Sequence, residues 1–146
     1  VGSRLETVVR TLQRPILACP AGFTSPQRVM IAFDGSATTH KAVEMVAGSP
    51  LFRGLPCHVV MVGADNKENQ GQLEWARHTL EAAGFEVETV LQEGDVEGVL
   101  CGYRREQDID MLIMGAYGHS VIRRFLVGST TTSVIRNALI PVLLLR

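Results

Sequence analysis

Short apolar runs alternate with longer amphipathic stretches, and this alternation most constrains the fold of the chain. Five runs have the length and composition of buried strands, at residues 28–33, 57–62, 85–91, 111–114 and 141–145. Helical spacing and capping residues predict helices at 38–47, 67–83, 95–107 and 129–137. Strands that alternate with helices in this way predict an α/β fold of the Rossmann-like type, a doubly wound five-stranded parallel sheet covered on both faces.

Two of the runs differ in a way that places them in the sheet. Residues 111–114 are apolar on both faces and predict a central strand, whereas residues 85–91 alternate and predict a strand nearer an edge. Open sheets of this class bind ligands beyond the carboxyl ends of their strands, where the strand order reverses. Asp34-Gly35 and Gly115 follow predicted strands, so both are candidate ligand contacts.

Composition narrows the choice of partner and compartment. Lys and Arg number 14 against 15 Asp and Glu, and the net charge of −1 disfavours binding to nucleic acid or an anionic membrane. No apolar run approaches the roughly 20 residues of a membrane-spanning helix, and the first residues lack a signal-peptide pattern. Cys19, Cys57 and Cys101 are odd in number and widely spaced, so we expect free thiols and a cytoplasmic protein.

A glycine pattern carries the strongest functional signal. Gly115-Ala-Tyr-Gly118 follows a predicted buried strand, and Gly128-Ser129 comes nine residues later, at the start of a predicted helix. Glycines let the backbone approach a ligand closely, and the free N–H groups at a helix start favour phosphate. A plain turn shaped by glycines is the alternative. Because no GxxxxGK[ST] sequence is present, the loop is predicted to hold a nucleotide more than to cleave it.

This pattern resembles that of the universal stress protein family in its ATP-binding branch, which has the same glycine spacing followed by Gly-Ser or Gly-Thr. The resemblance covers residues 28–146 and includes Asp34-Gly35-Ser36 and the closing Pro-Val-Leu-Leu-Leu. It implies a sheet of order 3-2-1-4-5, of the adenine nucleotide alpha hydrolase-like type. It also implies bound ATP, often with a divalent ion such as Mg²⁺, and a role in survival under stress, growth arrest or energy limitation.

The same resemblance assigns roles to individual residues. Asp34 is expected to accept a hydrogen bond from the ribose, the backbone near Val62 to meet the adenine edge, and the glycine loop to hold the phosphates. Two of these residues have alternative roles, since Asp34 in an Asp-Gly-Ser turn can cap a helix and His119 can be a solvated loop residue. The implied nucleotide-binding set is Asp34, Val62, Gly115, Gly118, His119, Gly128, Ser129 and Thr130.

An internal repeat accounts for the first 20 residues, which do not fit the alternation. Residues 1–17 resemble residues 127–143 without a gap, with identity at the Gly-Ser pair, at Arg10 and at Pro15. We interpret residues 1–20 as the tail of a preceding homologous domain, 21–27 as a linker and 28–146 as the universal stress protein domain. Chance similarity between two helix–proline–strand segments is the alternative.

The repeat also predicts a strand pairing. If residues 14–19 formed the final strand of a preceding domain, they belong beside the final strand of this one, whose free edge is otherwise open to aggregation. We expect Ile16–Cys19 to lie antiparallel to Val142–Leu145, within one chain or across a homodimer. An apolar stripe on the first helix is expected to stay partly exposed or to pack against another copy, and it consists of Leu5, Val8, Val9 and Leu12.

Three functions fit these observations. The first is a nucleotide-binding stress-response module with a regulatory or signalling role, in which ATP orders the glycine loop. The second is a slow ATPase, and the third is a scaffold without a ligand. The missing P-loop lysine favours the first over the second, and tightly bound nucleotide would exclude the third.

Overall fold

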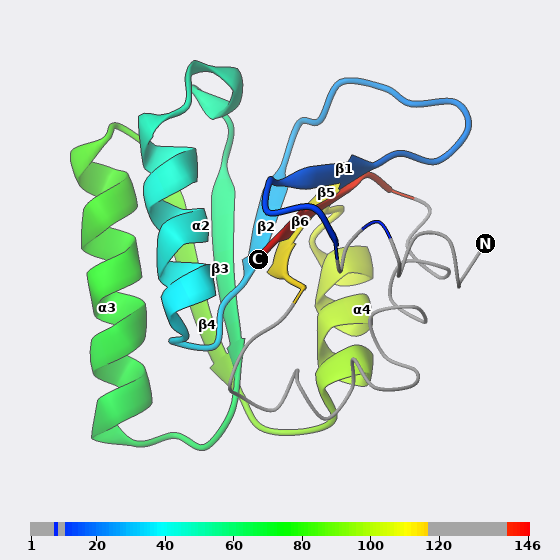
Figure 1. Cartoon of the computed structure of the whole chain (residues 1–146). Helices are drawn as coiled ribbons and strands as arrows, with labels where there is room; N and C mark the ends of the chain where they lie inside the picture. The colour runs from blue at the N-terminus through cyan, green and yellow to red at the C-terminus, as the bar shows by residue number, and fades with distance from the viewer. Residues whose placement is uncertain (1–7, 9–10, 117–139) are drawn as a thin grey trace.

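The computed structural model describes residue 8, residues 11–116 and residues 140–146 (Figure 1). In this part of the chain the strands are β1 (Ile16–Ala18), β2 (Val29–Ala32), β3 (Cys57–Val62), β4 (Val87–Gln92), β5 (Met111–Gly115) and β6 (Val142–Leu145). The helices are α2 (Ala37–Gly48), α3 (Lys67–Ala82) and α4 (Val96–Glu106), and a 3₁₀ turn, η1 (Pro50–Phe52), follows α2. The predicted helix at 129–137 lies outside the described residues.

The strands form one sheet of order β1-β6-β5-β2-β3-β4. From β2 to β6 every neighbouring pair is parallel. Counted from β2 as the first strand, this is the predicted order 3-2-1-4-5, so the doubly wound fold is confirmed. The edge position of β4 and the inner position of β5 are confirmed too, since β4 is only partly buried and β5 is buried throughout.

The strand β1 adds a sixth strand to the five predicted for residues 28–146. It pairs antiparallel with β6, with Ile16 opposite Leu144 and Ala18 opposite Val142. The whole sheet therefore has six strands and is mixed, and within it the strands of residues 28–146 form the predicted five-stranded parallel sheet. The pairing itself was expected from the repeat, and it is confirmed within one chain. The strand β1 is the outer strand at this side of the sheet, and its Leu17 is 48% exposed.

Each helix begins at a polar residue that caps its free N–H groups. Ser36, Asn66 and Asp95 precede α2, α3 and α4, and each side chain accepts a backbone N–H from the first turn. Asp95 is the first residue of the helix predicted at 95–107, and it caps α4. Helix α3 ends one residue before the predicted bound at residue 83, and the N–H of Gly84 donates to the carbonyl of Glu81 at 2.9 Å.

The core lies in two layers, one on each face of the sheet (Figure 1). Helices α2 and α3 cover one face, where Ile31 of β2 is fully buried. Helix α4 covers the other face, where Met30 and Ala32 of the same strand are buried. Side chains alternate along a strand, so successive residues at the carboxyl ends of β2 and β3 point to opposite layers of the core. Beyond these strand ends, the space between the two layers is open.

Candidate functional site

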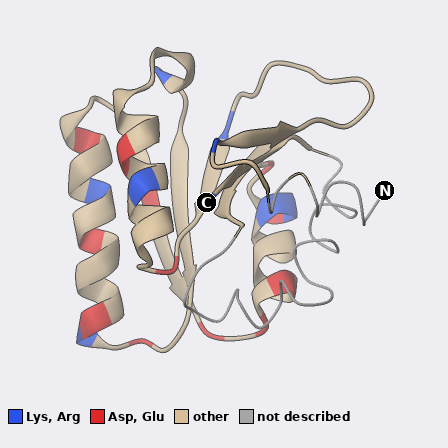
Figure 2. Ribbon diagram, viewed as in Figure 1, with Lys and Arg blue, Asp and Glu red and all other residues tan. Residues whose placement is uncertain are grey.

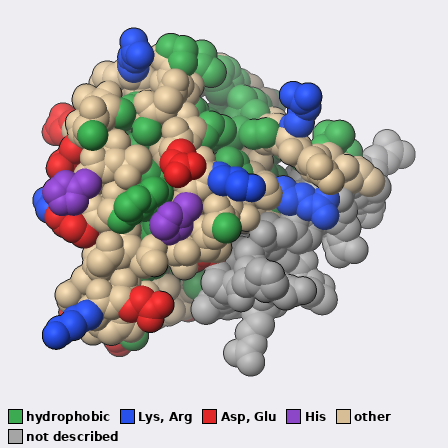
Figure 3. Space-filling model, turned by 60° about the vertical axis from the view of Figure 1, so that its left-hand side comes forward, with side chains coloured by type: hydrophobic (Ala, Val, Ile, Leu, Met, Phe, Trp, Pro, Cys, Tyr) green, Lys and Arg blue, Asp and Glu red, His purple; other side chains and the backbone are tan. Residues whose placement is uncertain are grey.

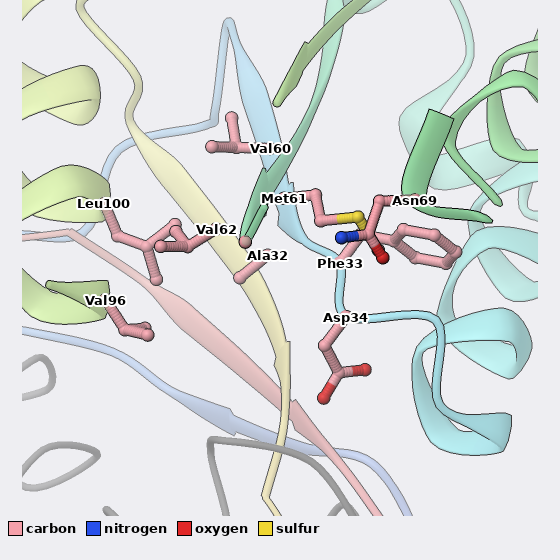
Figure 4. Close-up of a pocket in the computed structure, with 10 residues that line it drawn as sticks. Ala32, Phe33, Asp34, Val60, Met61, Val62, Asn69, Val96 and Leu100 are labelled. Carbon is pink, nitrogen blue, oxygen red and sulfur yellow. The ribbon is translucent and has the colours of Figure 1, made fainter. Parts of the chain in front are cut away.

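A cavity of about 190 Å³ lies at the carboxyl ends of β2 and β3 (Figure 4). Ala32, Val62, Val96 and Leu100 line it on the α4 side, while Phe33, Met61 and Asn69 line it on the side of α2 and α3. Sites that enclose a whole drug-sized ligand usually have roughly 300–1,000 Å³. The described walls therefore fit a planar group, such as a purine base, better than a whole nucleotide.

The walls of this cavity are mainly apolar. Asp34 is the charged side chain among the described residues that line it. Elsewhere in the described part, acidic and basic residues are interspersed on the helices (Figure 2). A single carboxylate beside an apolar slot is suited to accept hydroxyl hydrogen bonds from a ligand whose other face is flat and apolar.

Asp34 itself is held by the turn that follows β2. Its Oδ1 accepts the N–H of Ser36 at 2.9 Å and the hydroxyl of Thr39 at 2.8 Å. Thr39 is fully buried, so this hydroxyl is a rigid anchor. The turn-forming role that the sequence offered for Asp34 is therefore present, although Ser36 rather than Asp34 is the N-cap of α2. The carboxylate also lines the cavity, and its contact with a ribose remains a prediction.

Val62 owes its position to a difference in length between two strands. The ladder between β2 and β3 ends where Ala32 faces Val60, and the last bond runs from the Phe33 N–H to the Val60 carbonyl at 2.9 Å. Strand β3 continues to Val62, which is paired only with Gln92 of β4. Backbone groups two residues apart face the same side of a strand, so the N–H and C=O of Val62 face the side where β2 has ended. This geometry fits the predicted contact with the edge of a base.

Gly115 has a packing reason to be glycine. A Cβ at this position would lie 3.3 Å from Cγ2 of Thr38, in the first turn of α2. The glycine thus lets α2 approach the end of β5, next to the point where the strand order reverses. Its predicted contact with phosphate stays a prediction. The other members of the predicted phosphate site, Gly118, His119, Gly128, Ser129 and Thr130, lie outside the described residues.

Asn69 lines the cavity, and sequence reasoning missed it. It lies in the first turn of α3, and its Nδ2 donates to the carbonyl of Ala64 at 2.8 Å. Gly63, the residue after β3, lies directly beneath the amide, because a Cβ there would be 3.2 Å from Nδ2. The sequence could have indicated this contact in two ways: a glycine directly follows the strand, and a residue with a side-chain amide lies early in the next helix.

Two pairs of side chains, each made of a histidine and an aromatic residue, lie outside the set of residues that line the cavity. The ring of His40 stacks on Trp75 with centroids 4.0 Å apart, and its Nε2 is 2.7 Å from Oε1 of Gln72. Trp75 packs against the core, and the pair joins α2 to α3. Figure 3 shows this side of the molecule, where one histidine lies beside apolar side chains and another lies among charged ones.

The second pair joins β3 to α4. Nδ1 of His58 lies 2.7 Å from the hydroxyl of Tyr103, and both residues are buried. Burial lowers the pKa of His58, and the nearby Glu88 carboxylate opposes this effect. Burial also raises the pKa of Tyr103 to about 12, and that of the Cys57 thiol to about 12. These groups are uncharged at neutral pH and act as core residues.

The described residues contain no group of three or more His, Cys, Asp or Glu side chains that could hold a metal ion. In the same part of the chain, no helix is long and apolar enough to span a bilayer. Cys19, Cys57 and Cys101 are all free thiols, as expected. The expected Mg²⁺ therefore has no binding group of this kind among the described side chains.

The model of the universal stress protein family matches residues 26–146. The chain belongs to the universal stress protein family. Universal stress protein Slr1230 of Synechocystis sp. is 40% identical over 148 residues, an alignment that covers all of this chain and 52% of Slr1230. Universal stress protein MJ0531 of Methanocaldococcus jannaschii is 29% identical over 108 residues, covering 72% of this chain and 63% of the relative. This universal stress protein thus spans about half the length of Slr1230.

Solved structures of the family share this fold. A universal stress protein from Archaeoglobus fulgidus superposes with a TM-score of 0.80 at 24% identity, covering 100% of this chain and 54% of that one. A universal stress protein in complex with cAMP has a TM-score of 0.68 at 23% identity, covering 84% and 98%. A universal stress protein family protein of Arabidopsis thaliana with AMP bound has a TM-score of 0.62 at 17% identity, covering 82% of this chain and 91% of that one. A universal stress protein of A. fulgidus in complex with dAMP has a TM-score of 0.62 at 22% identity, covering 84% of this chain and 100% of that one.

Proposed function

We propose that this universal stress protein binds an adenine nucleotide at the carboxyl end of its sheet and acts as a regulatory stress-response module. One observation carries the proposal: the cavity joins an apolar slot, the carboxylate of Asp34 and the backbone edge of Val62 at one point. The slot fits a base, the backbone N–H and C=O match its hydrogen-bonding edge, and the carboxylate is suited to ribose hydroxyls. Family members of the same fold that carry cAMP, AMP and dAMP support this choice of ligand.

The nucleotide we propose is ATP, with Mg²⁺ between its phosphates. The glycine loop from Gly115 to Ser129 would hold the phosphates, since it follows β5 at the same edge of the sheet. Because the sequence lacks a P-loop lysine, we propose a nucleotide-responsive role rather than fast catalysis, in the cytoplasm.

We also propose that residues 1–20 are the tail of a preceding homologous domain. The antiparallel pairing of β1 with β6 supports this, because β1 matches β6 in the internal repeat. The length of Slr1230, about twice that of this chain, supports it as well. In this account two domains associate through their final strands, in a tandem protein or a homodimer.

A thermal unfolding series tests nucleotide binding. Protein shown by mass spectrometry to be nucleotide-free is heated with and without AMP or ATP and Mg²⁺. Ligand at a hundred times its dissociation constant adds about 2.7 kcal/mol to the free energy of unfolding. For a domain of this size that raises the melting temperature by roughly 5–10 °C. The absence of any shift with either nucleotide contradicts the proposal and favours a scaffold.

Matched variants then locate the site. Asp34→Asn keeps an oxygen acceptor for the Ser36 and Thr39 bonds but removes the negative charge that we assign to the ribose. Asp65→Asn makes the same change at an exposed residue outside the cavity lining. We expect weaker nucleotide binding from Asp34→Asn alone. Equal affinities in the two variants would contradict the role of Asp34.

A further inference from the structure

We propose that His40 is a positioning residue for the nucleotide site, although its side chain is not among those that line the cavity. It belongs to a group of three side chains, the His40 cluster, made of His40 of α2 with Gln72 and Trp75 of α3. In this proposal the cluster sets the separation of two cavity walls, the turn that carries Asp34 and the first turn of α3. The inference rests on the proposed function, since it concerns the geometry of that same cavity.

The two walls belong to different elements of the fold. Asp34 lies in the turn between β2 and α2, and Asn69 lies in the first turn of α3 (Figure 4). The hydrogen bonds that Asp34 accepts from Ser36 and Thr39 tie this turn to α2. Neither bond reaches α3, so contacts from α3 to the turn and to α2 help to set the separation of the two walls.

The His40 cluster makes such contacts one helical turn away from both walls. His40 follows the cap Ser36 by one turn, and its N–H donates to the Ser36 carbonyl at 2.9 Å. Gln72 follows Asn69 by about one turn of α3. Nε2 of His40 lies 2.7 Å from Oε1 of Gln72, and the imidazole stacks on the Trp75 ring with centroids 4.0 Å apart. The bond and the stacked rings therefore join α2 to α3 beside the site.

Gln72 also lies against the turn itself. Gly35, the residue after Asp34, has a φ of +73°, a left-handed conformation that favours glycine. A Cβ at Gly35 would lie 3.5 Å from Cδ of Gln72, which is ordinary contact distance. A free glutamine side chain has many rotamers, so its bond to His40 keeps this packing in place.

The residue before Asp34 contacts the two rings of the cluster. Phe33 lines the cavity, and its ring centroid lies 6.3 Å from that of Trp75 and 5.4 Å from that of His40. The His40 cluster thus supports the chain on both sides of Asp34. A site whose walls are already held in place loses less conformational freedom when a ligand binds, so this support is expected to raise the affinity for the nucleotide.

Titration calorimetry of the nucleotide-free full chain with AMP tests the inference. Gln72→Met keeps the length of the side chain and deletes its polar end, and His40→Phe keeps a flat ring beside Trp75 and deletes the ring nitrogens. We expect each variant to bind AMP about three- to tenfold more weakly, the effect of one lost hydrogen bond. His78→Phe is the matched control with wild-type affinity, because it deletes a contact of Nε2 with Glu74 at 2.9 Å, outside the cavity lining.

The double variant His40→Phe/Gln72→Met shows whether the two side chains act through their mutual bond. It is expected to lose no more affinity than one single variant, because both changes delete the same bond. Unfolding curves verify that each variant is folded. A merely structural contact would lower the unfolding midpoint and leave the affinity of the folded protein unchanged.

Unchanged affinity in folded Gln72→Met or His40→Phe overturns the inference, as do losses that add in the double variant; in both cases the proposed function stands. A wild-type protein that binds no AMP overturns the proposed function and the inference with it.

Discussion

Replacement of Thr39 by valine tests how the turn that carries Asp34 is held. The Thr39 side chain is fully buried, and its hydroxyl donates to Oδ1 of Asp34 at 2.8 Å. Valine has nearly the same shape, so the substitution leaves no cavity. It deletes the short bond to the carboxylate, together with the weaker contacts of the same hydroxyl with the Ser36 carbonyl at 3.1 Å and the Asp34 N–H at 3.4 Å. Hydrogen bonds to a carboxylate contribute about 1.5–3 kcal/mol. Since Asp34 keeps the N–H of Ser36, we expect a loss of about 2 kcal/mol in the free energy of unfolding.

Urea unfolding followed by circular dichroism measures this loss. With an m-value of about 2 kcal/mol per molar, typical of domains this size, the midpoint is expected to fall by about 1 M urea. Thr79→Val is the control, because that hydroxyl donates to a neutral acceptor, the Trp75 carbonyl within α3, at 2.8 Å. A free energy of unfolding for Thr39→Val within 0.5 kcal/mol (about the scatter of surface substitutions) of wild type would refute the argument. So would a loss no larger than that of the control.

The remaining predictions concern pH, the glycine loop and the edge of the sheet. Because burial lowers the pKa of His58 below its ordinary 6.5, this side chain takes up its proton in the unfolded chain before it does so in the folded one as the pH falls. The free energy of unfolding is therefore expected to fall as the pH falls through 6.5. Urea titrations at several pH values should show that the free energy of unfolding of His58→Gln depends less on pH than that of the exposed control His78→Gln. An equal dependence on pH in the two variants would contradict this. Gly118→Val is expected to abolish ATP binding in a folded protein, and an unchanged affinity in calorimetry would show that the loop does not hold phosphate. Deletion of residues 1–20 uncovers β6, so sedimentation should show self-association, and an unchanged profile would show that β1 does not cover the edge.

Much of the fold could be predicted because buried strands leave a strong local signal. The run at 57–62 has the bounds of β3 residue for residue, and the alternation at 85–91 correctly indicated the edge position of β4. The pairing of β1 with β6 followed from the internal repeat, a signal of a different kind. The five strands predicted for residues 28–146 are all present, and the tail strand joins the same sheet as its sixth strand.

The candidate site was less accessible to sequence reasoning. Asp34 follows a predicted strand, so a rule about strand ends was enough to select it, whereas Val62 was selected through the family resemblance. Asn69 is a polar residue in an amphipathic helix, and only the meeting of the end of β3 with the first turn of α3 brings it to the cavity. Gly115 was selected for a phosphate role, whereas its contact with Thr38 depends on packing between segments far apart in the sequence.

The central claim is that an adenine nucleotide binds in the cavity at the ends of β2 and β3. Backbone amide spectra of ¹⁵N-labelled, nucleotide-free protein titrated with AMP test both binding and location. The account predicts saturable shifts centred on Asp34, Val62, Gly63 and Asn69. Shifts centred instead on the groove beside α4 lined by Gly98, Cys101 and Arg105, or no saturable shift with either AMP or ATP, would contradict it.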